Sequence, residues 1–294
     1  MNVIEASHIT KDYGHHKGVF DVTFAVEKGE VLGFLGPNGA GKTTAIRQLM
    51  GFIKPDQGEV TILGMDCFQE CAQVQKQLGY LPGEIAFMDD MSGMEFIKFI
   101  ANLKHVKDME IARQLIAYLE LDPSGKLKKM SKGMKQKIGL VCAFMQNPDI
   151  LILDEPTSGL DPLMQSKFVH LIKQAKASGK TILMSSHIFE EVEHTCDRVI
   201  ILREGEVVTN ENMEELRSKK QKIYQITFAK DAELHRFLAQ HPIYQADGKQ
   251  VTIQLSGSVD HLVKELGNYT IQDFSTRTQS LEELFMQYYG GSQK

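Results

Sequence analysis

A nine-residue glycine-rich segment constrains the fold of this chain more than any other stretch. It follows the pattern G-x-x-x-x-G-K-[ST] and consists of Gly36, Pro37, Asn38, Gly39, Ala40, Gly41, Lys42, Thr43 and Thr44. The apolar run Val31–Leu35 before it predicts a buried strand, and Ala45–Met50 after it predicts a helix. A strand, a glycine-rich turn and a helix in this order predict a phosphate-binding loop.

The glycines explain how such a loop binds phosphate. They let backbone N–H groups turn inward around a polyphosphate, and the start of the following helix adds partial positive charge. We expect Lys42 to contact the β- and γ-phosphates of a nucleotide and the Thr43 hydroxyl to ligate Mg²⁺. The alternative is a glycine-rich turn without a ligand, and the strand and helix that flank the pattern argue against it.

The composition is that of an ordinary globular protein. The chain has 294 residues, 42% of them hydrophobic, a length that suits one large and one small domain. The net charge of −5 argues against a general nucleic-acid binder, and no apolar run reaches the roughly 18–20 residues needed to cross a bilayer. The N-terminus lacks the charged and apolar regions of a secretion signal, so we expect a cytosolic protein.

The chain contains four cysteines, Cys67, Cys71, Cys142 and Cys196. The spacing of Cys67 and Cys71 would place two metal ligands on one face of a helix. No second pair of cysteines or histidines at zinc spacing accompanies them, so the sequence favours reduced thiols.

Two carboxylates follow a second strongly apolar run. The residues Ile150–Leu153 predict a strand buried on both faces, and Asp154 and Glu155 come at its end, where open α/β sheets bind ligands. We expect Asp154 to hold Mg²⁺ and Glu155 to polarise an attacking water. Acidic residues that merely cap a strand beside Pro156 are the alternative, and the phosphate-binding loop upstream argues against it.

A lysine-rich segment, Lys126–Lys137, opens a helix predicted over Lys132–Met145. Such a run is most often a solvated helix face. Ser131 is a suitable N-cap, and a helix start with Gly133 and excess positive charge also suits a phosphate. The lysines alone do not decide between these alternatives.

A histidine follows another predicted buried strand, Thr181–Ser185. A single histidine is more often structural than catalytic. His187, however, would lie at the same sheet edge as Asp154 and Glu155, from where it can reach a γ-phosphate.

The sequence changes in character after Asn210. A charged helical linker, Glu214–Lys222, precedes alternating strand and helix patterns in the order β-α-β-β-α-β-α, which predict a small domain of ferredoxin-like type. Asp247-Gly248, between Ile243–Ala246 and Gln250–Leu255, predicts a hairpin. We find no catalytic cluster in this part of the sequence.

Taken together, residues 1–217 resemble the nucleotide-binding subunit of an ATP-binding cassette (ABC) transporter. Tyr13 matches the aromatic residue that stacks on adenine, residues 36–44 match the Walker A loop, and Ser131–Gln136 resembles the signature motif. Ile150–Glu155 matches Walker B with its catalytic glutamate, Ser158–Asp161 matches the D-loop, and His187 matches the switch histidine.

The resemblance implies an α/β fold. It has a P-loop NTPase core with an antiparallel β subdomain and a helical insert at about residues 84–135. A small C-terminal α+β domain, residues 218–294, follows the core and resembles the tail of cassette subunits of drug and antibiotic exporters.

The sequence departs from the family pattern at two places. The signature has Lys132 in place of the first glycine, a version similar to that of exporters for drugs, bacitracin-like peptides and sodium. The glutamine expected after the predicted strand that ends at Pro82 is replaced by Gly83, and Glu84 follows it. Glu84 is a candidate substitute as a metal ligand.

The resemblance also implies cofactors and partners. ATP with Mg²⁺ would lie between two nucleotide-binding subunits, as a homodimer or heterodimer, with Ser131, Gly133 and Asp161 supplied from across the interface. Separate permease subunits in the membrane would hold the chain at the cytoplasmic face, docking near Phe87, Met88 and Met91. No nucleic-acid partner is implied.

Two other classes of function are possible from the sequence. A soluble cassette ATPase that acts on ribosomes or nucleic acid usually carries two cassettes or a long coiled coil, and this chain shows one cassette and no sustained heptads. An inactive regulatory cassette is disfavoured because Glu155 and His187 are both present. The sequence therefore favours an ATPase that powers export.

Overall fold

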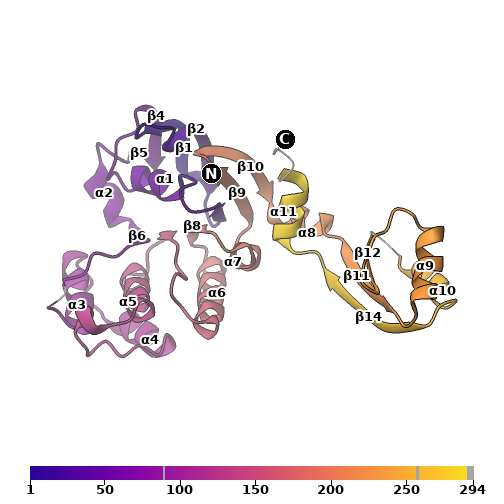
Figure 1. Cartoon of the computed structure of the whole chain (residues 1–294). Helices are drawn as coiled ribbons and strands as arrows, with labels where there is room; N and C mark the ends of the chain where they lie inside the picture. The colour runs from indigo at the N-terminus through magenta and orange to yellow at the C-terminus, as the bar shows by residue number, and fades with distance from the viewer. Residues whose placement is uncertain (89, 256–257, 290–294) are drawn as a thin grey trace. The chain divides into compact units, whose positions relative to one another are not determined.

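The computed structural model describes residues 1–88, 90–255 and 258–289 (Figure 1). The chain divides into two compact units, Met1–Met213 and Glu214–Lys294. The domain boundary predicted at residue 217 lies within helix α8 (Met213–Lys219), just after this division.

The first unit begins with a four-stranded antiparallel sheet. Its strands are β1 (Asn2–Asp12), β2 (Gly18–Glu27), β4 (Gln57–Ile62) and β5 (Met65–Asp66), in the order β2-β1-β4-β5. Buried and more exposed side chains alternate along β2, as its sequence predicts. Helix α2 (Cys71–Lys76) follows β5. Cys67 precedes α2, so Cys67 and Cys71 do not share a helix face, and all four cysteines are free thiols.

A six-stranded sheet forms the centre of this unit. Its strands are β10 (Glu206–Asn212), β9 (Arg198–Arg203), β3 (Val31–Leu35), β8 (Thr181–Ser186), β7 (Ile150–Asp154) and β6 (Leu78–Leu81), in that order. All neighbouring pairs are parallel except β9 and β10. Every residue of β3, β7 and β8 is buried, which confirms the prediction that these strands are buried in the sheet.

The remaining helices of the first unit lie between the strands along the chain. They are α1 (Lys42–Leu49), α3 (Gly93–Leu103), α4 (Glu110–Tyr118), α5 (Lys132–Phe144), α6 (Pro162–Ala177) and α7 (Phe189–Thr195), with a 3₁₀ turn at Leu127–Lys129. Helices α3, α4 and α5 lie side by side, apart from the antiparallel sheet (Figure 1). Helices α3 and α4 and the first residues of α5 fall within the helical insert predicted at about residues 84–135, and α5 continues to the central sheet, where it contacts β6.

One apolar core joins the antiparallel sheet, helix α1 and the central sheet. Ile4 of β1, Ile46 of α1 and Ile152 of β7 are all fully buried in it. The rings of Phe24 and Phe34 meet edge to face, with centroids 4.8 Å apart. Because burying one such side chain contributes roughly 2 kcal/mol, this shared core holds the phosphate-binding loop against both sheets.

The second unit consists of helices α8, α9 (Asp231–Gln240), α10 (Asp260–Leu266) and α11 (Leu281–Tyr289) with four strands. The strands are β11 (Lys222–Phe228), β12 (Ala246–Asp247), β13 (Gln250–Leu255) and β14 (Ile271–Thr278), and they pair antiparallel in the order β12-β13-β11-β14. This is the strand order of a ferredoxin-like sheet.

The predicted hairpin is shorter than its sequence suggests. The Tyr244 N–H donates to the His241 carbonyl, so a turn follows α9, and the strand predicted over Ile243–Ala246 is wrong except at Ala246, which belongs to β12. On the first side of the hairpin, Ala246 and Asp247 are the described residues that pair with β13. Ile243 is 80% exposed, because a turn so close to the end of α9 leaves its side chain without a sheet to pack on.

No helix within the described residues has the length and apolar character that a bilayer-spanning segment needs.

Candidate nucleotide site

The phosphate-binding loop and the predicted catalytic residues meet at one edge of the central sheet. The loop follows β3, Glu155 follows β7 and His187 follows β8. Because β3, β8 and β7 are parallel neighbours, their carboxyl ends lie together, with Asp154 paired to Ser185 and Leu35 paired to Ser186. The sheet therefore brings together residues that are more than a hundred positions apart in the sequence.

The loop needs glycine at specific positions. Gly39 and Gly41 have φ angles of +84° and +102°, in the left-handed region that favours glycine. A Cβ atom on Gly36 would lie 2.3 Å from the carbonyl oxygen of Leu202 on β9. The loop thus packs directly on the backbone of the sheet, and its geometry alone favours glycine at these positions.

Lys42 is held at the mouth of the loop. Its side chain is 5% exposed, and the ammonium donates to the carbonyl oxygens of Gly36 (2.7 Å) and Pro37 (3.1 Å). The same Nζ atom lies 3.3 Å from Oε1 of Glu155, an ion pair without hydrogen-bond geometry. The lysine and glutamate predicted to share a nucleotide are thus in direct contact.

Glu155 also contacts the predicted switch histidine. Its Oε2 atom lies 2.6 Å from Nδ1 of His187. A carboxylate can only accept, so Nδ1 carries the proton in this pair. Glu155 has a φ of +48°, which is uncommon outside glycine and asparagine and is held by the turn after β7.

Asp154 is fully buried at the end of β7. Its Oδ1 atom accepts from the Ser185 hydroxyl at 2.5 Å, and that hydroxyl oxygen accepts the Glu155 N–H at 3.0 Å. The other carboxylate oxygen, Oδ2, is buried and has no hydrogen-bond partner among the described residues. A Cβ atom built on Gly83 would lie 3.1 Å from it.

These residues fit Mg²⁺. An orphaned, buried carboxylate oxygen is costly unless a ligand satisfies it, and Mg²⁺ in nucleotide sites is typically held by one or two carboxylates together with substrate phosphates. Thr43, in the first turn of α1, is half-buried. Within the described residues no three acidic, histidine or cysteine side chains form a metal cage of their own.

Glu84 makes no hydrogen bond with Asp154. Glu84 lies in the loop after β6 with its side chain exposed, and no hydrogen bond or ion pair joins it to any described residue. The small Gly83, instead, is the residue that lies over the Asp154 carboxylate.

The predicted signature motif contacts the predicted D-loop within the same chain. Ser131 is the N-cap of α5, as its sequence predicts, and accepts the Met134 N–H at 3.2 Å. A Cβ atom on Gly133 would lie 2.6 Å from the Gly159 carbonyl oxygen, so the two segments touch at their backbones. Ser131 is exposed. Asp161 caps α6 by accepting the Met164 N–H at 3.0 Å.

Tyr13 lies in the loop between β1 and β2 and is 52% exposed. Its backbone N–H donates to the Lys17 carbonyl, which closes the loop. In the same loop His16 stacks on Phe20, with ring centroids 4.4 Å apart. The exposed face of Tyr13 is thus available to a planar ligand.

Two polar residues that the sequence analysis did not single out as site residues support the site. Gln136 donates from Nε2 to the carbonyl oxygens of Glu155 (3.1 Å) and Pro156 (2.9 Å), and Ser185 bridges Asp154 to the Glu155 backbone. The only sequence signal for Gln136 and Ser185 is their place inside a signature motif and a strand end.

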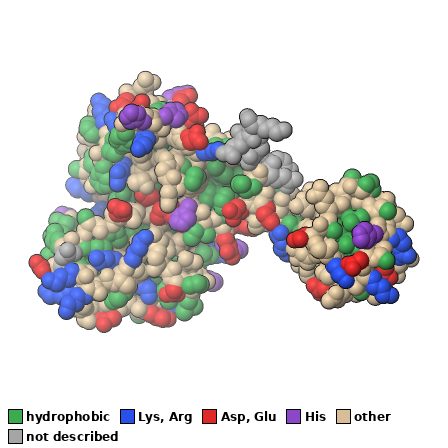
Figure 2. Space-filling view, viewed as in Figure 1, with side chains coloured by type: hydrophobic (Ala, Val, Ile, Leu, Met, Phe, Trp, Pro, Cys, Tyr) green, Lys and Arg blue, Asp and Glu red, His purple; other side chains and the backbone are tan. Residues whose placement is uncertain are grey.

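The lysines before Ser131 belong to the surface of the helical part. Figure 2 shows Lys and Arg side chains gathered over this part of the first unit. The Lys126 ammonium donates to the Asp90 carbonyl oxygen at 2.5 Å, and Lys128 lies 3.5 Å from the Asp90 carboxylate. These contacts with an exposed aspartate agree with the interpretation of the lysine-rich segment as a solvent-exposed face.

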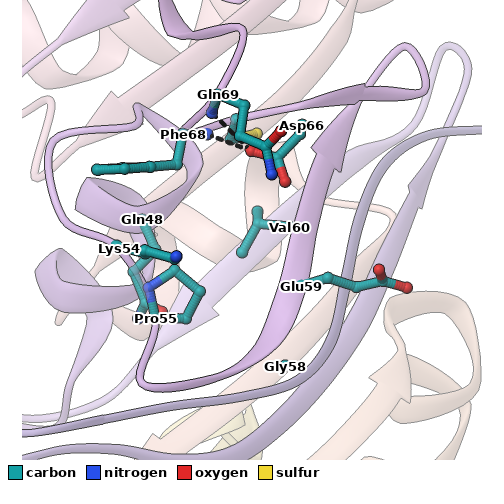
Figure 3. Close-up of a pocket in the computed structure, with 10 residues that line it drawn as sticks. Gln48, Lys54, Pro55, Gly58, Glu59, Val60, Asp66, Phe68 and Gln69 are labelled. Atoms are coloured by element: carbon teal, nitrogen blue, oxygen red, sulfur yellow. Dashed lines mark hydrogen bonds between the residues drawn. The ribbon is translucent and has the colours of Figure 1, made fainter.

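Two hollows in the first unit lie away from the nucleotide edge. The larger, of about 1280 Å³, is lined by Ile150 and Thr181, the first residues of β7 and β8, and thus lies at the opposite end of the sheet. The smaller, of about 60 Å³, lies under α1 and is lined by Gln48, Lys54 and Phe68, while the Glu59 carboxylate points away from it (Figure 3).

Comparisons with known proteins agree with this geometry. The family model described as "ABC transporter" matches residues 19–158. The linearmycin resistance ATP-binding protein LnrL of Bacillus subtilis is 35% identical over 70% of this chain and 68% of its own length. The uncharacterized ABC transporter ATP-binding protein YhcH of the same organism is 30% identical over 98% of this chain and 96% of its own length.

A solved structure of an ATP-binding subunit of an ABC transporter also resembles the chain. It superposes with a TM-score of 0.66 and 31% identity, and covers 73% of this chain and 92% of its own. The predicted fold class is confirmed. The chain therefore belongs to the ABC transporter family, as one of its ATP-binding, ATP-hydrolysing subunits.

Proposed function

We propose that this chain powers export through separate permease subunits by hydrolysing ATP at the edge of its central sheet. The observation that carries the proposal is the placement of Glu155, which contacts both Lys42 of the phosphate-binding loop and His187. A base next to the phosphate-binding lysine is the arrangement that water attack on a γ-phosphate requires.

Different residues of the site bind the nucleotide and carry out its hydrolysis. Tyr13 stacks on the adenine, the backbone of residues 36–44 surrounds the phosphates, and Lys42 contacts the β- and γ-phosphates. Glu155 accepts a proton from the attacking water, and His187 orients the Glu155 carboxylate through its 2.6 Å hydrogen bond.

Asp154 and Thr43 are the residues that would hold Mg²⁺, with Glu84 as a further candidate in the loop after β6. When bound, the ion neutralises charge on the phosphates. The orphaned Oδ2 atom of Asp154 supports this assignment.

Each active site is completed by a second nucleotide-binding subunit, identical or similar. Ser131 is exposed at the start of a 13-residue helix, and Gly133 packs on the D-loop that ends at Asp161. A helix start of this kind favours an anion. Among the described residues, no hydrogen bond or ion pair joins Ser131 to the phosphate-binding loop of its own chain. We infer that Ser131, Gly133 and Asp161 act on the nucleotide of the partner.

The docking surface for the permease is the loop that leads into the helical part. Met88 is 46% exposed there, whereas the Phe87 ring packs on Phe96 with centroids 4.9 Å apart. Phe87 thus anchors the loop, and Met88 is its exposed contact. The proposal places the chain at the cytoplasmic face of the membrane. Relatedness to a linearmycin resistance protein supports an antibiotic or drug as the exported substrate.

The test is co-purification of the full chain from detergent extracts of its own cells. We expect a membrane protein to be recovered with the parent chain, and much less of it with Met88→Asp. Met286→Asp, at an exposed methionine of the second unit that is 67% exposed, is the matched control. Recovery of ribosomes or DNA in place of a membrane protein would establish the competing function.

A further inference from the structure

Glu191 is a buried carboxyl group that the site described so far does not use. It lies in α7 and is 6% exposed. Its Oε2 atom accepts two hydroxyls, from Ser186 at 2.6 Å and from Thr157 at 3.2 Å. Its Oε1 atom is buried and has no hydrogen-bond partner among the described residues.

Keeping a carboxyl group in this place is costly. Burial raises the pKa of Glu191 to about 7, with the nearby charge of Glu155 adding to the shift and the two hydroxyls opposing it. A well-packed apolar side chain would usually fill such a position at lower free energy. The carboxyl group therefore needs an explanation other than packing.

The two hydroxyl partners of Glu191 belong to the two segments that carry the proposed catalytic pair. Thr157 comes two residues after Glu155, and Ser186 immediately precedes His187. One carboxyl oxygen thus joins the turn after β7 to the end of β8. Gln136 also holds this turn, by donating to the carbonyl oxygens of Glu155 and Pro156.

We propose that Glu191 is a positioning residue for ATP hydrolysis, which sets the separation of Glu155 and His187 by holding Thr157 and Ser186. The inference rests on the roles proposed above for Glu155 and His187. It is specific in its chemistry, because the position needs an acceptor for two hydroxyl groups. A glutamine can supply that acceptor, whereas an alanine cannot.

The first test compares variants of the full chain in steady-state ATP hydrolysis. We expect Glu191→Ala to lower kcat about tenfold and to leave KM for ATP within about twofold, because misplacing a reacting group costs rate and not substrate binding. Glu191→Gln is expected to restore most of the rate. Thr157→Val, which removes one of the two hydroxyls, is expected to show a smaller loss.

Thr195→Val is the matched control. The Thr195 hydroxyl donates to the backbone carbonyl of Glu191 at 2.7 Å, so this variant disturbs the same helix without touching the carboxyl group. We expect it to lower thermal stability and to leave kcat within about twofold. An equal loss of kcat in Thr195→Val and Glu191→Ala would overturn the proposal, since general loosening of α7 would then explain both.

The decisive test is a double-mutant cycle with His187→Ala, read out by single-turnover phosphate release. If Glu191 acts by placing His187 against Glu155, its replacement by alanine has little further effect once His187 is absent. A full additional tenfold loss in the double variant would show that Glu191 acts elsewhere.

The cycle also separates this inference from the proposed function. A slow His187→Ala variant together with a fully active Glu191→Ala variant would remove only the positioning role. A fully active His187→Ala variant would remove the proposed role of His187 and the inference with it. Where Glu191→Ala does not fold, Thr157→Val in the same cycle replaces it.

Discussion

The ammonium group of Lys42 lies 3.3 Å from Oε1 of Glu155, although the two residues are 113 positions apart in the sequence. The other oxygen of the same carboxylate accepts from His187 at 2.6 Å. A polyphosphate in the loop offers Lys42 more oxygen acceptors than Glu155 does. Nucleotide binding is therefore expected to draw Lys42 away from Glu155 and leave the carboxylate to His187 and water.

Replacing Glu155 by glutamine separates binding from chemistry. The amide keeps the size of the side chain but cannot accept the proton, so we expect Glu155→Gln to bind ATP with parent-like affinity and to lose at least about a hundredfold in turnover. Gel filtration with ATP is expected to show a dimer that persists. Hydrolysis at the parent rate would remove Glu155 from the role of base.

Replacing Tyr13 by alanine tests the stacking surface. The ring contributes about 1 kcal/mol to stacking, so Tyr13→Ala is expected to raise the Kd for ATP about fivefold. Tyr13→Phe keeps the ring and is expected to bind like the parent. Equilibrium binding of a fluorescent ATP analogue measures all three proteins, and equal Kd values for alanine and phenylalanine would show that the ring does not contact the nucleotide.

Ser131 and Ser92 are a matched pair of helix caps. Ser92 caps α3 by accepting the Glu95 N–H at 3.2 Å, as Ser131 caps α5. Loss of either hydroxyl is expected to lower the free energy of unfolding by about 1 kcal/mol. Only Ser131→Ala is expected to lose ATP-dependent dimerisation and hydrolysis as well. If both variants lose activity to the same extent, Ser131 has no role beyond its cap.

Gly83 is expected to tolerate no side chain over Asp154. A Cβ atom there lies 3.1 Å from Oδ2, so Gly83→Ala is expected to raise the Mg²⁺ concentration for half-maximal hydrolysis about tenfold. Gly125→Ala is the control, because its nearest neighbour would be 3.7 Å away. A Mg²⁺ titration of ATP hydrolysis measures both, and unchanged curves would argue against Asp154 as the ligand.

The buried Glu191 predicts a dependence of stability on pH. Its pKa is raised from 4.5 to about 7, so between these values the folded protein binds a proton that the unfolded chain has released. The contribution of this group to stability is therefore complete below pH 4.5 and is lost as the pH rises through 7.

Glu191→Gln has no titrating carboxyl group at this position, so it does not lose stability as the pH rises through 7. We expect the variant to gain stability relative to the parent between pH 5 and pH 8, on the order of 3 kcal/mol in the free energy of unfolding. Chemical denaturation at the two pH values measures the difference. Parallel pH profiles for the two proteins would show that Glu191 keeps an ordinary pKa.

Helices and strands of several residues could be predicted from the sequence, because the pattern of their side chains lies within a short stretch of the chain. Strands β3 and β7 consist of apolar runs, and Ser131 could be recognised as a helix cap from its neighbours. Strand β5 and strand β12 have two residues each, too few for any period to show. The strand predicted over Ile243–Ala246 forms only at Ala246, because a turn follows the end of α9, and the alternation of side chains does not show where that helix ends.

By itself the sequence determined the phosphate-binding loop and the order of the catalytic motifs, because each is a short run of residues with its own chemistry. Only the tertiary structure decided that Gly83 lies over Asp154, that Gln136 holds the backbone of Glu155, and that Glu191 joins Thr157 to Ser186. These contacts join separate strands and helices. They depend on the order of strands in the sheet and on the packing of α5 and α7, which no local pattern records.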